Sequence, residues 1–398
     1  MLLQAGQLLS SAGTQSTTIV YSLLTLALTG SAAKAGVVAF ARTAPIAAFS
    51  LLAGAAADRT DRKVVMVCAD AARAAATGAL AIVLLRGSAP FGAIVAVALI
   101  EGTGYAFFAP AASGALRSVV PPPQLGDAAG AEQARLATVR LAGPPLGGVL
   151  YGLGRAVPFV VDAASYVCSL VSIVLMRTPF QEARETETES LRARVGAGLR
   201  FVWAQPFLRT VALIFSLLNA VALGTLLALV VAGRRQGLSG GEIGALVAAF
   251  GAAMVLGSLA SPLARRRLAP GVILVLELWT WPLIGAFVLW PDVYVLTAAM
   301  TACGFAIPIT DSTVIGYRLA ITPDRLVGRV AGVQTTTIVI GAPLGSLGAG
   351  LLLDGVGARA TIGVLAGVAL GLAVWGTLSP ALRSAPKLDR LAEVTAPR

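Results

Sequence analysis

The sequence contains no histidine, three lysines and three cysteines among 398 residues. Without histidine, a Ser-His or Cys-His nucleophile and a zinc site built on imidazole are excluded. No lysine follows a glycine, so the chain has no Walker A loop for ATP. Cys68, Cys168 and Cys303 lie far apart in apolar runs, and we expect them to be buried packing residues. The sequence therefore predicts a protein that is not an enzyme, with no catalytic residue, no metal site and no cofactor.

Charged residues are also scarce, at 12% against 57% hydrophobic residues, whereas soluble domains have about 25% charged residues. A membrane-spanning helix needs about 20 apolar residues, so this length fits about twelve spans. The net charge of +11 comes mostly from Lys and Arg in connections on one side of those spans. This bias is typical of cytoplasmic loops. It predicts a multi-pass membrane protein with both termini in the cytoplasm, and no nucleic-acid partner. The Ala- and Arg-rich usage suggests a bacterium of high GC content, and so a bacterial cytoplasmic (inner) membrane.

The apolar runs divide the chain into two halves. We expect spans at 2–29, 35–57, 64–85, 91–112, 130–153, 157–176, 208–232, 241–263, 271–290, 292–315, 330–353 and 359–378, each bounded by Gly, Pro or charge. The predicted domains are a six-helix bundle at 1–176, a cytoplasmic linker at 177–207, a second six-helix bundle at 208–380 and a cytoplasmic tail at 381–398.

The linker has two parts. Residues 181–189 are mostly acidic and polar, which predicts a solvated segment, whereas 191–202 has apolar residues at helical spacing. The second part resembles an amphipathic helix in the membrane interface, with Trp203 as an anchor.

The two halves repeat short motifs. Gly-Pro-Pro-Leu-Gly at 143–147 is echoed by Gly-Ala-Pro-Leu-Gly at 341–345, and Pro-Pro-Gln-Leu at 122–125 by Pro-Asp-Arg-Leu at 323–326. Duplicated halves with a substrate site between them are an organisation found among secondary transporters.

A densely charged turn at 54–63 joins the second and third spans, and its marked residues are Gly54, Asp58, Arg59, Asp61, Arg62 and Lys63. It resembles the loop between the second and third helices of major facilitator superfamily transporters, with Asp61 where the broad pattern has Gly. The resemblance implies an all-α membrane protein with twelve transmembrane helices in two pseudo-symmetric six-helix bundles. It also implies that Asp58 stabilises the N-terminal dipole of the eleventh helix, near Arg329, as a cytoplasmic latch. The alternative is a basic turn that only sets topology.

The fifth span carries a second motif. Gly130, Gly143, Pro144, Gly147 and Gly148 resemble the antiporter motif of exporters in the superfamily, with Val139 in place of the middle Gly. Small residues allow close helix packing in lipid, and Pro bends a helix. The match favours export, and the alternative is general helix packing.

Segments at 107–111, 160–166 and 200–209 resemble the exporter branch that contains macrolide and enterobactin efflux proteins. One departure lies in the first span, which reads Gly13-Thr14 where this branch often has Gly-Asp.

Ionisable residues at membrane depth are candidates for proton coupling. They are Glu101, Asp162, Arg140, Asp70 and Arg73. Asp70 and Arg73 are spaced to pair on one helix face, and an ion pair between Glu101 and Arg140 is a hypothesis. Without histidine, a proton relay must use carboxylates, and Glu101 and Asp162 are the preferred ones. The alternative for each is a static structural pair.

Together these features predict a monomeric secondary transporter that exports a small amphipathic compound against proton entry, in contact with membrane lipids. Candidate residues for its substrate cavity are Gln15, Tyr21, Tyr105, Asn219, Asp311 and Thr313. The alternatives are an uptake permease or facilitator, and a non-transporting membrane sensor or scaffold.

Overall fold

The computed structural model describes residues 2–119, 125–176, 180, 191–323, 326–383 and 385, which are almost entirely helical and contain no strand. The first half consists of α1 (Leu2–Thr29), α2 (Ala32–Arg59), α3 (Arg62–Leu85), α4 (Phe91–Val119), α5 (Leu125–Leu153) and α6 (Val157–Leu175). The connecting helix is α7 (Leu191–Ala204). The second half consists of α8 (Pro206–Arg235), α9 (Gly240–Arg267), α10 (Pro270–Thr280), the 3₁₀ helix η2 (Trp281–Gly285), α11 (Ala286–Leu289), α12 (Val293–Ile321), α13 (Val327–Val339), α14 (Gly341–Gly355), α15 (Gly357–Leu378) and α16 (Pro380–Arg383).

The predicted all-helical membrane fold is confirmed. In the described part of the chain, ten segments are long and apolar enough to cross a membrane. Two predicted spans are interrupted: 271–290 is divided into α10, η2 and α11, and 330–353 into α13 and α14. The helices α1 and α5 have 28 and 29 residues but are not among the ten, so the count of twelve spans stays a prediction for these two.

The helix ends follow from local sequence. Asp61 precedes α3, and its carboxylate accepts a hydrogen bond from the backbone N–H of Lys63 at 2.8 Å. Ser239 and Glu242 form a reciprocal capping box at the start of α9, which satisfies two otherwise unpaired backbone groups. Gly30, between α1 and α2, has a φ of +67° that other residues rarely adopt.

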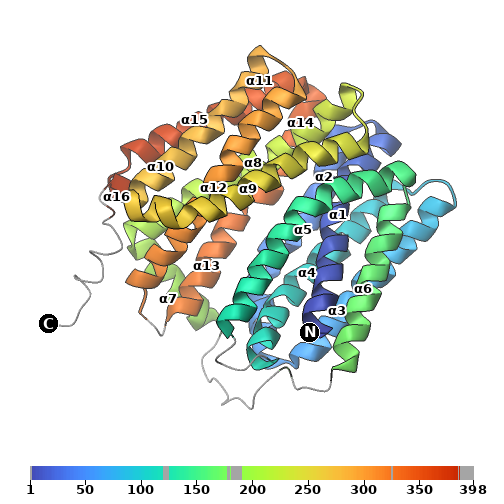
Figure 1. Ribbon diagram of the computed structural model, residues 1–398, viewed down its shortest axis with the longest axis horizontal. Helices are drawn as coiled ribbons and strands as arrows, with labels where there is room; N and C mark the ends of the chain where they lie inside the picture. Colours follow the sequence, from blue (N-terminus) through green and yellow to red (C-terminus); the bar gives the residue numbers. More distant parts are fainter. Residues whose placement is uncertain are drawn as a thin grey trace.

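The two halves lie beside each other in Figure 1, the first in blue to green and the second in yellow to red. Their main mutual contacts run between α2 and α14 and between α5 and α9. Within each half, glycines allow equivalent helices to approach closely. The glycines of 143–147 on α5 lie against α1, and those of 341–345 on α14 lie against α8. A Cβ at any of the four would meet atoms of the neighbouring helix, which belong to Gln15, Ser16, Ser216 and Ala220.

The molecule has two ends, which we name the turn end, where α2 meets α3, and the far end, where α1 meets α2. The halves touch closely at the far end. A Cβ on Gly36 of α2 would meet the Ser346 carbonyl oxygen of α14 at 2.6 Å, and Gly148 of α5 lies against the backbone of Gly240 at the start of α9. Nearby, Asp354 of α14 reaches the start of α2.

Candidate functional site

Polar side chains from five helices of the first half meet inside the protein, and we call them the N-terminal polar cluster. The exposed fraction is at most 2% for Asp70, Arg73, Glu101 and Asp162 and 14% for the Arg42 side chain. The uncharged members are Thr14, Thr17 and Thr18 of α1 and Ser165 and Tyr166 of α6. All the charged members except Arg42 were predicted to be candidates for proton coupling, and the fold brings them together.

Arg73 joins three helices of the cluster. Its Nη1 donates to Asp70 Oδ1 at 3.3 Å, so the predicted pairing of these two residues is confirmed. Its Nη2 donates to Tyr166 Oη at 2.7 Å and to Thr14 Oγ1 at 2.9 Å. The guanidinium also lies over the Tyr166 ring, 4.0 Å from its centroid, an arrangement that stabilises the cation.

The partner predicted for Glu101 was wrong. Glu101 Oε1 pairs with Arg42 Nη2 of α2 at 3.2 Å, not with Arg140. Gly102 explains this, because the backbone of Arg42 occupies the space that a Cβ would need, which brings α2 against α4. Arg140 lies on α5, near Asp311 of α12 in the other half.

Asp162 has hydroxyl partners only. Its Oδ2 accepts a hydrogen bond from Thr17 Oγ1 at 3.2 Å and its Oδ1 one from Ser165 Oγ at 3.5 Å. No ion pair to Asp162 occurs among the residues that the structure describes. The cluster thus holds three carboxyl groups but only two guanidinium groups.

Thr14, which stands where the exporter branch that the sequence resembles often has Asp, is a junction of the cluster. Its hydroxyl lies 2.8 Å from Tyr166 Oη and accepts the hydrogen bond from Arg73. The adjacent Gly13 lies against Asp162, because a Cβ there would meet Asp162 Oδ1 at 2.6 Å. A carboxyl group therefore does lie beside Gly13 and Thr14 of α1, but it is that of Asp162 on α6.

Sequence reasoning missed several members of this cluster: Arg42, Tyr166 and the hydroxyls of Thr14, Thr17 and Thr18 as hydrogen-bonding partners. One signal was available. Thr14, Thr17 and Thr18 recur at the three- and four-residue spacing that places side chains on one helix face.

Two of the six predicted cavity residues lie at the cluster. Gln15 Oε1 accepts a hydrogen bond from Thr18 at 3.3 Å. Tyr21 is 2% exposed, and the Arg42 guanidinium lies 5.4 Å from its ring centroid. The structure does not bring the other four to this place: Tyr105 is exposed, Asp311 is near Arg140, and the side chains of Asn219 and Thr313 donate to carbonyl groups of their own helices.

The charged turn is partly described. Lys63 Nζ donates to the carbonyl oxygens of Val174 and Met176 at 3.1 and 2.7 Å, and so satisfies carbonyls at the end of α6. Arg62 is 6% exposed, and its Nη1 donates to the Phe180 carbonyl oxygen at 3.3 Å. These contacts join the start of α3 to the end of α6 and to Phe180.

The predicted latch lies outside the described residues. The side chains of Asp58 and Arg59 and the surroundings of Gly130 are among the parts that are not described, and Gly54 has no neighbour within 4 Å of a built Cβ. The contact between Asp58 and the start of the eleventh span near Arg329 therefore stays a prediction.

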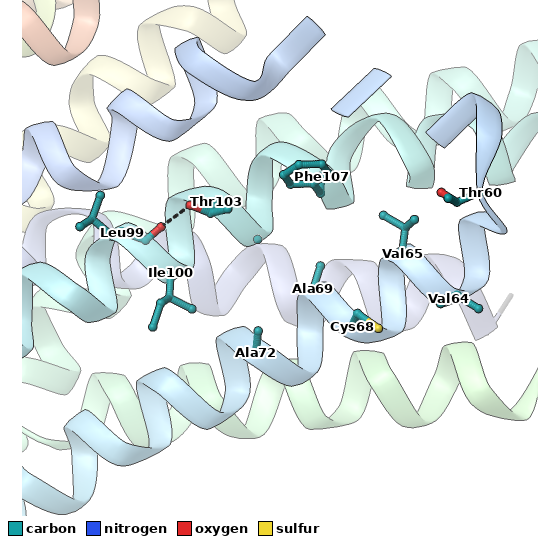
Figure 2. Close-up of a pocket in the computed structure, with 11 residues that line it drawn as sticks. Thr60, Val64, Val65, Cys68, Ala69, Ala72, Leu99, Ile100, Thr103 and Phe107 are labelled. Carbon is teal, nitrogen blue, oxygen red and sulfur yellow. Dashed lines mark hydrogen bonds between the residues drawn. The ribbon is translucent and has the colours of Figure 1, made fainter. Parts of the chain in front are cut away.

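A groove of about 600 Å³ approaches the cluster from outside, between α3 and α4. Figure 2 shows Val65, Cys68, Leu99, Ile100 and Phe107 around it, and the Thr103 hydroxyl turned back to the Leu99 carbonyl at 2.7 Å. The lining is consequently apolar.

The wall of this groove is thin. A Cβ on Gly104 would meet Arg73 Cγ and Cδ at 2.6 Å, so the stem of Arg73 separates the groove from the cluster. Cys68 faces the groove and is exposed, as is Cys168, whereas Cys303 is buried. The expectation of burial was thus wrong for two cysteines, because apolar residues on the outer faces of these helices are exposed as well.

Comparisons with known proteins place the chain among transporters. Residues 2–396 match the family described as transmembrane secretion effector. The multidrug efflux pump Tap of Mycolicibacterium fortuitum is 29% identical over an alignment of 404 positions, which covers 96% of each chain. Macrolide efflux protein A of Streptococcus pyogenes is 30% identical over 44% of this chain and 43% of that protein. The enterobactin exporter EntS of Shigella boydii is 29% identical over 61% of this chain and 58% of that protein.

The fold agrees with these matches. The crystal structure of the nucleoside transporter NupG has a TM-score of 0.76 to this chain at 14% identity, covering 96% of this chain and 98% of that one. The matches to efflux proteins confirm the predicted resemblance to the exporter branch. Because the family match spans nearly all 398 residues, this chain belongs to the transmembrane secretion effector family of the major facilitator superfamily.

Proposed function

We propose that this protein is a secondary active transporter that exports a small amphipathic compound across the inner membrane of a bacterium by proton antiport. Relatives named as a multidrug pump, a macrolide efflux protein and an enterobactin exporter support export and suggest a drug, antibiotic or siderophore as cargo. Two halves joined along α2–α14 and α5–α9 suit alternating access by a monomer.

The observation that carries proton coupling is the charge count of the N-terminal polar cluster. If all three carboxyl groups were ionised, one negative charge would stay uncompensated in a buried site, and the burial of an ion costs several kcal/mol. One carboxyl group therefore holds a proton in this state. Glu101 and Asp70 each have an arginine partner, so we assign the proton to Asp162.

Close contact of the halves at the far end supports a state of the transport cycle that is closed on that side. We take the far end to be periplasmic and the turn end cytoplasmic, with both termini in the cytoplasm. In this state the compound would enter from the cytoplasm, and the proton on Asp162 would leave to the cytoplasm. Asp162 would take up its next proton from the periplasm in the opposite state. The Asp58 latch would close the cytoplasmic side in that opposite state.

Membrane lipid is the proposed surrounding of the apolar groove. Its lining residues Val64, Leu99 and Ile100 are more than 40% exposed and lie on helices that are apolar enough to span a bilayer. Lipid tails are the solvent that such a face requires.

The proposal is tested by uptake of labelled candidate compounds into inside-out vesicles with an imposed proton gradient. The native protein should accumulate a substrate only when the gradient is present. Asp162→Asn should lose accumulation at least tenfold but keep exchange of labelled for unlabelled substrate, since the fold keeps its hydrogen-bonding groups. Glu242→Gln, which changes an exposed acid, is the matched control and should keep accumulation.

Four outcomes would contradict or narrow this proposal. Absence of gradient-dependent uptake for every candidate would exclude the antiporter, and uptake that only equilibrates would favour a facilitator. Accumulation by Asp162→Asn equal to that of the native protein would remove Asp162 from coupling. In the same vesicles, unchanged substrate-driven proton release in Glu101→Gln would exclude Glu101.

A further inference from the structure

A second buried acid lies in the other half of the molecule, with polar groups around it that have no partner. Glu277 of α10 and Trp281 of η2 are each 2% exposed, and Thr310 of α12 is 1% exposed. Among the described residues, Glu277 Oε2, Trp281 Nε1 and Thr310 Oγ1 form no hydrogen bond. The Trp281 and Thr310 side chains nevertheless lie next to the Glu277 carboxyl group. We call these three residues the Glu277 cluster.

The hydroxyl of Thr310 is unusual for its helix. Three other threonines of α12, namely Thr297, Thr301 and Thr313, donate to the carbonyl oxygen four residues earlier. Such a bond within the helix satisfies a buried hydroxyl group. Thr310 makes no such bond, which leaves its hydroxyl available to Glu277.

The α-helix is interrupted at Trp281. Regular α10 ends at Thr280, and the 3₁₀ helix η2 begins at Trp281, followed by Pro282. The Cys303 thiol of α12 donates to the Thr280 carbonyl oxygen at 3.4 Å, so a side chain contacts the backbone at the break. A stretch of 3₁₀ helix inside a span often marks a functional position, and here it places an indole N–H beside a buried acid.

The surroundings of Glu277 do not suit a negative charge. Among the described residues, the ionisable groups near the Glu277 carboxyl group are Asp311 and Cys303, both of α12. No ion pair to Glu277 occurs within the described ranges. A buried carboxylate without a cation is costly, whereas a neutral carboxylic acid both donates and accepts hydrogen bonds.

A metal cation fits this cluster poorly. The indole N–H of Trp281 is a donor only, so it competes with a cation for the carboxyl oxygens. Among the described residues, no three metal-binding side chains lie together in one group. A proton on Glu277 lets the acid donate to Thr310 Oγ1 or to one bridging water while it accepts from Trp281.

We infer that the Glu277 cluster is a second proton-binding site, separate from the N-terminal polar cluster and formed entirely by the second half of the chain. Each half then carries a proton-binding acid of its own. This inference goes beyond the proposed antiport through Asp162 and does not depend on it.

Infrared spectroscopy of the full chain in lipid nanodiscs tests this site, because a protonated carboxylic acid has a carbonyl band distinct from that of a carboxylate. At neutral pH, Glu277→Gln should lose one such band. Trp281→Phe and Thr310→Val should keep the band but move it to higher wavenumber, since each removes a group that would hydrogen-bond to the protonated acid. Glu242→Gln, at an exposed acid, should leave the region unchanged.

The two proton sites are separable in the same experiment. Asp162→Asn should keep the Glu277 band whether or not Asp162 itself holds a proton. A Glu277→Gln spectrum equal to the native one would overturn the inference, and so would a native carboxylate band that shifts when sodium is replaced by choline. If Glu277→Gln fails to fold, the Trp281→Phe and Thr310→Val shifts decide the question, and unshifted bands in both would also overturn it.

Discussion

Asp354 of α14 caps the start of α2 across the boundary between the two halves. Its Oδ1 accepts a hydrogen bond from the backbone N–H of Ala32 at 2.7 Å, and its Oδ2 accepts from that of Ala33 at 3.0 Å and from Ser31 Oγ at 2.5 Å. A carboxylate at a helix N-terminus is stabilising. This contact has the chemistry predicted for Asp58 at the turn end, but it lies at the far end and its acid comes from the other half.

Replacement of Asp354 by Ala should weaken closure of the far end. Loss of a cap costs about 0.5–2 kcal/mol, so the population open at the far end should rise about 2- to 30-fold. Spin labels at Ser88 and Val356, in a background without Cys68 and Cys168, would report this as a gain of long distances.

Asp292→Ala is the matched control for this change. Asp292 also caps a helix at the far end, since it accepts from the Tyr294 N–H at 2.7 Å, but it does so within one half. Its loss should lower stability without changing the distance distribution. An unchanged distribution in Asp354→Ala would show that the cap does not hold the far end closed.

The glycine motif of α5 makes a second prediction about the far end. Gly148 lies against the Gly240 backbone of the other half, whereas Gly152, one turn later on α5, has nothing within 4 Å of a built Cβ. Gly148→Ala should therefore separate α5 from α9 and speed amide hydrogen exchange in residues 236–241 several-fold. Gly152→Ala should leave exchange at the native rate, and equal rates in the two variants would refute the packing role of Gly148.

The pair of Arg42 and Glu101 predicts an asymmetric response to mutation. Arg42→Ala leaves a buried carboxylate without its cation, which costs about 3–5 kcal/mol, and should lower the thermal unfolding temperature markedly. Glu101→Gln removes the charge and should cost less. The double variant should be less destabilised than the sum of the two, because the groups are in direct contact. Strict additivity in thermal unfolding would show that the pair is not coupled.

The sequence alone predicts the membrane fold well, because long apolar runs and the bias of Lys and Arg are both consequences of the bilayer. It also predicts the pair of Asp70 and Arg73, because a separation of three residues on one helix brings side chains together. Both depend on information that is local in the chain.

Contacts between helices were harder to predict. Glu101 was assigned to Arg140 because both lie at similar depth, but depth does not say which face of a helix points inward. Gly102 determines the partner of Glu101, because the absence of a side chain there lets the backbone of α2 pack against α4. Asp354 received no prediction, since its position beside Ala32 depends on how the two halves pack.

The two ends of one helix segment connect the acid-rich interior to the closed end of the protein. Arg42, which holds Glu101, and Ala32, which is held by Asp354, lie ten residues apart on α2, or about 15 Å of helix. Pro45 lacks the N–H that would bond the Ala41 carbonyl oxygen, so the helical hydrogen bonds of this segment are interrupted only near its Arg42 end. Neutralising Glu101 would remove the ion pair at Arg42. We expect the effect to extend along α2 to the contact of Ala32 with Asp354 of the opposite half.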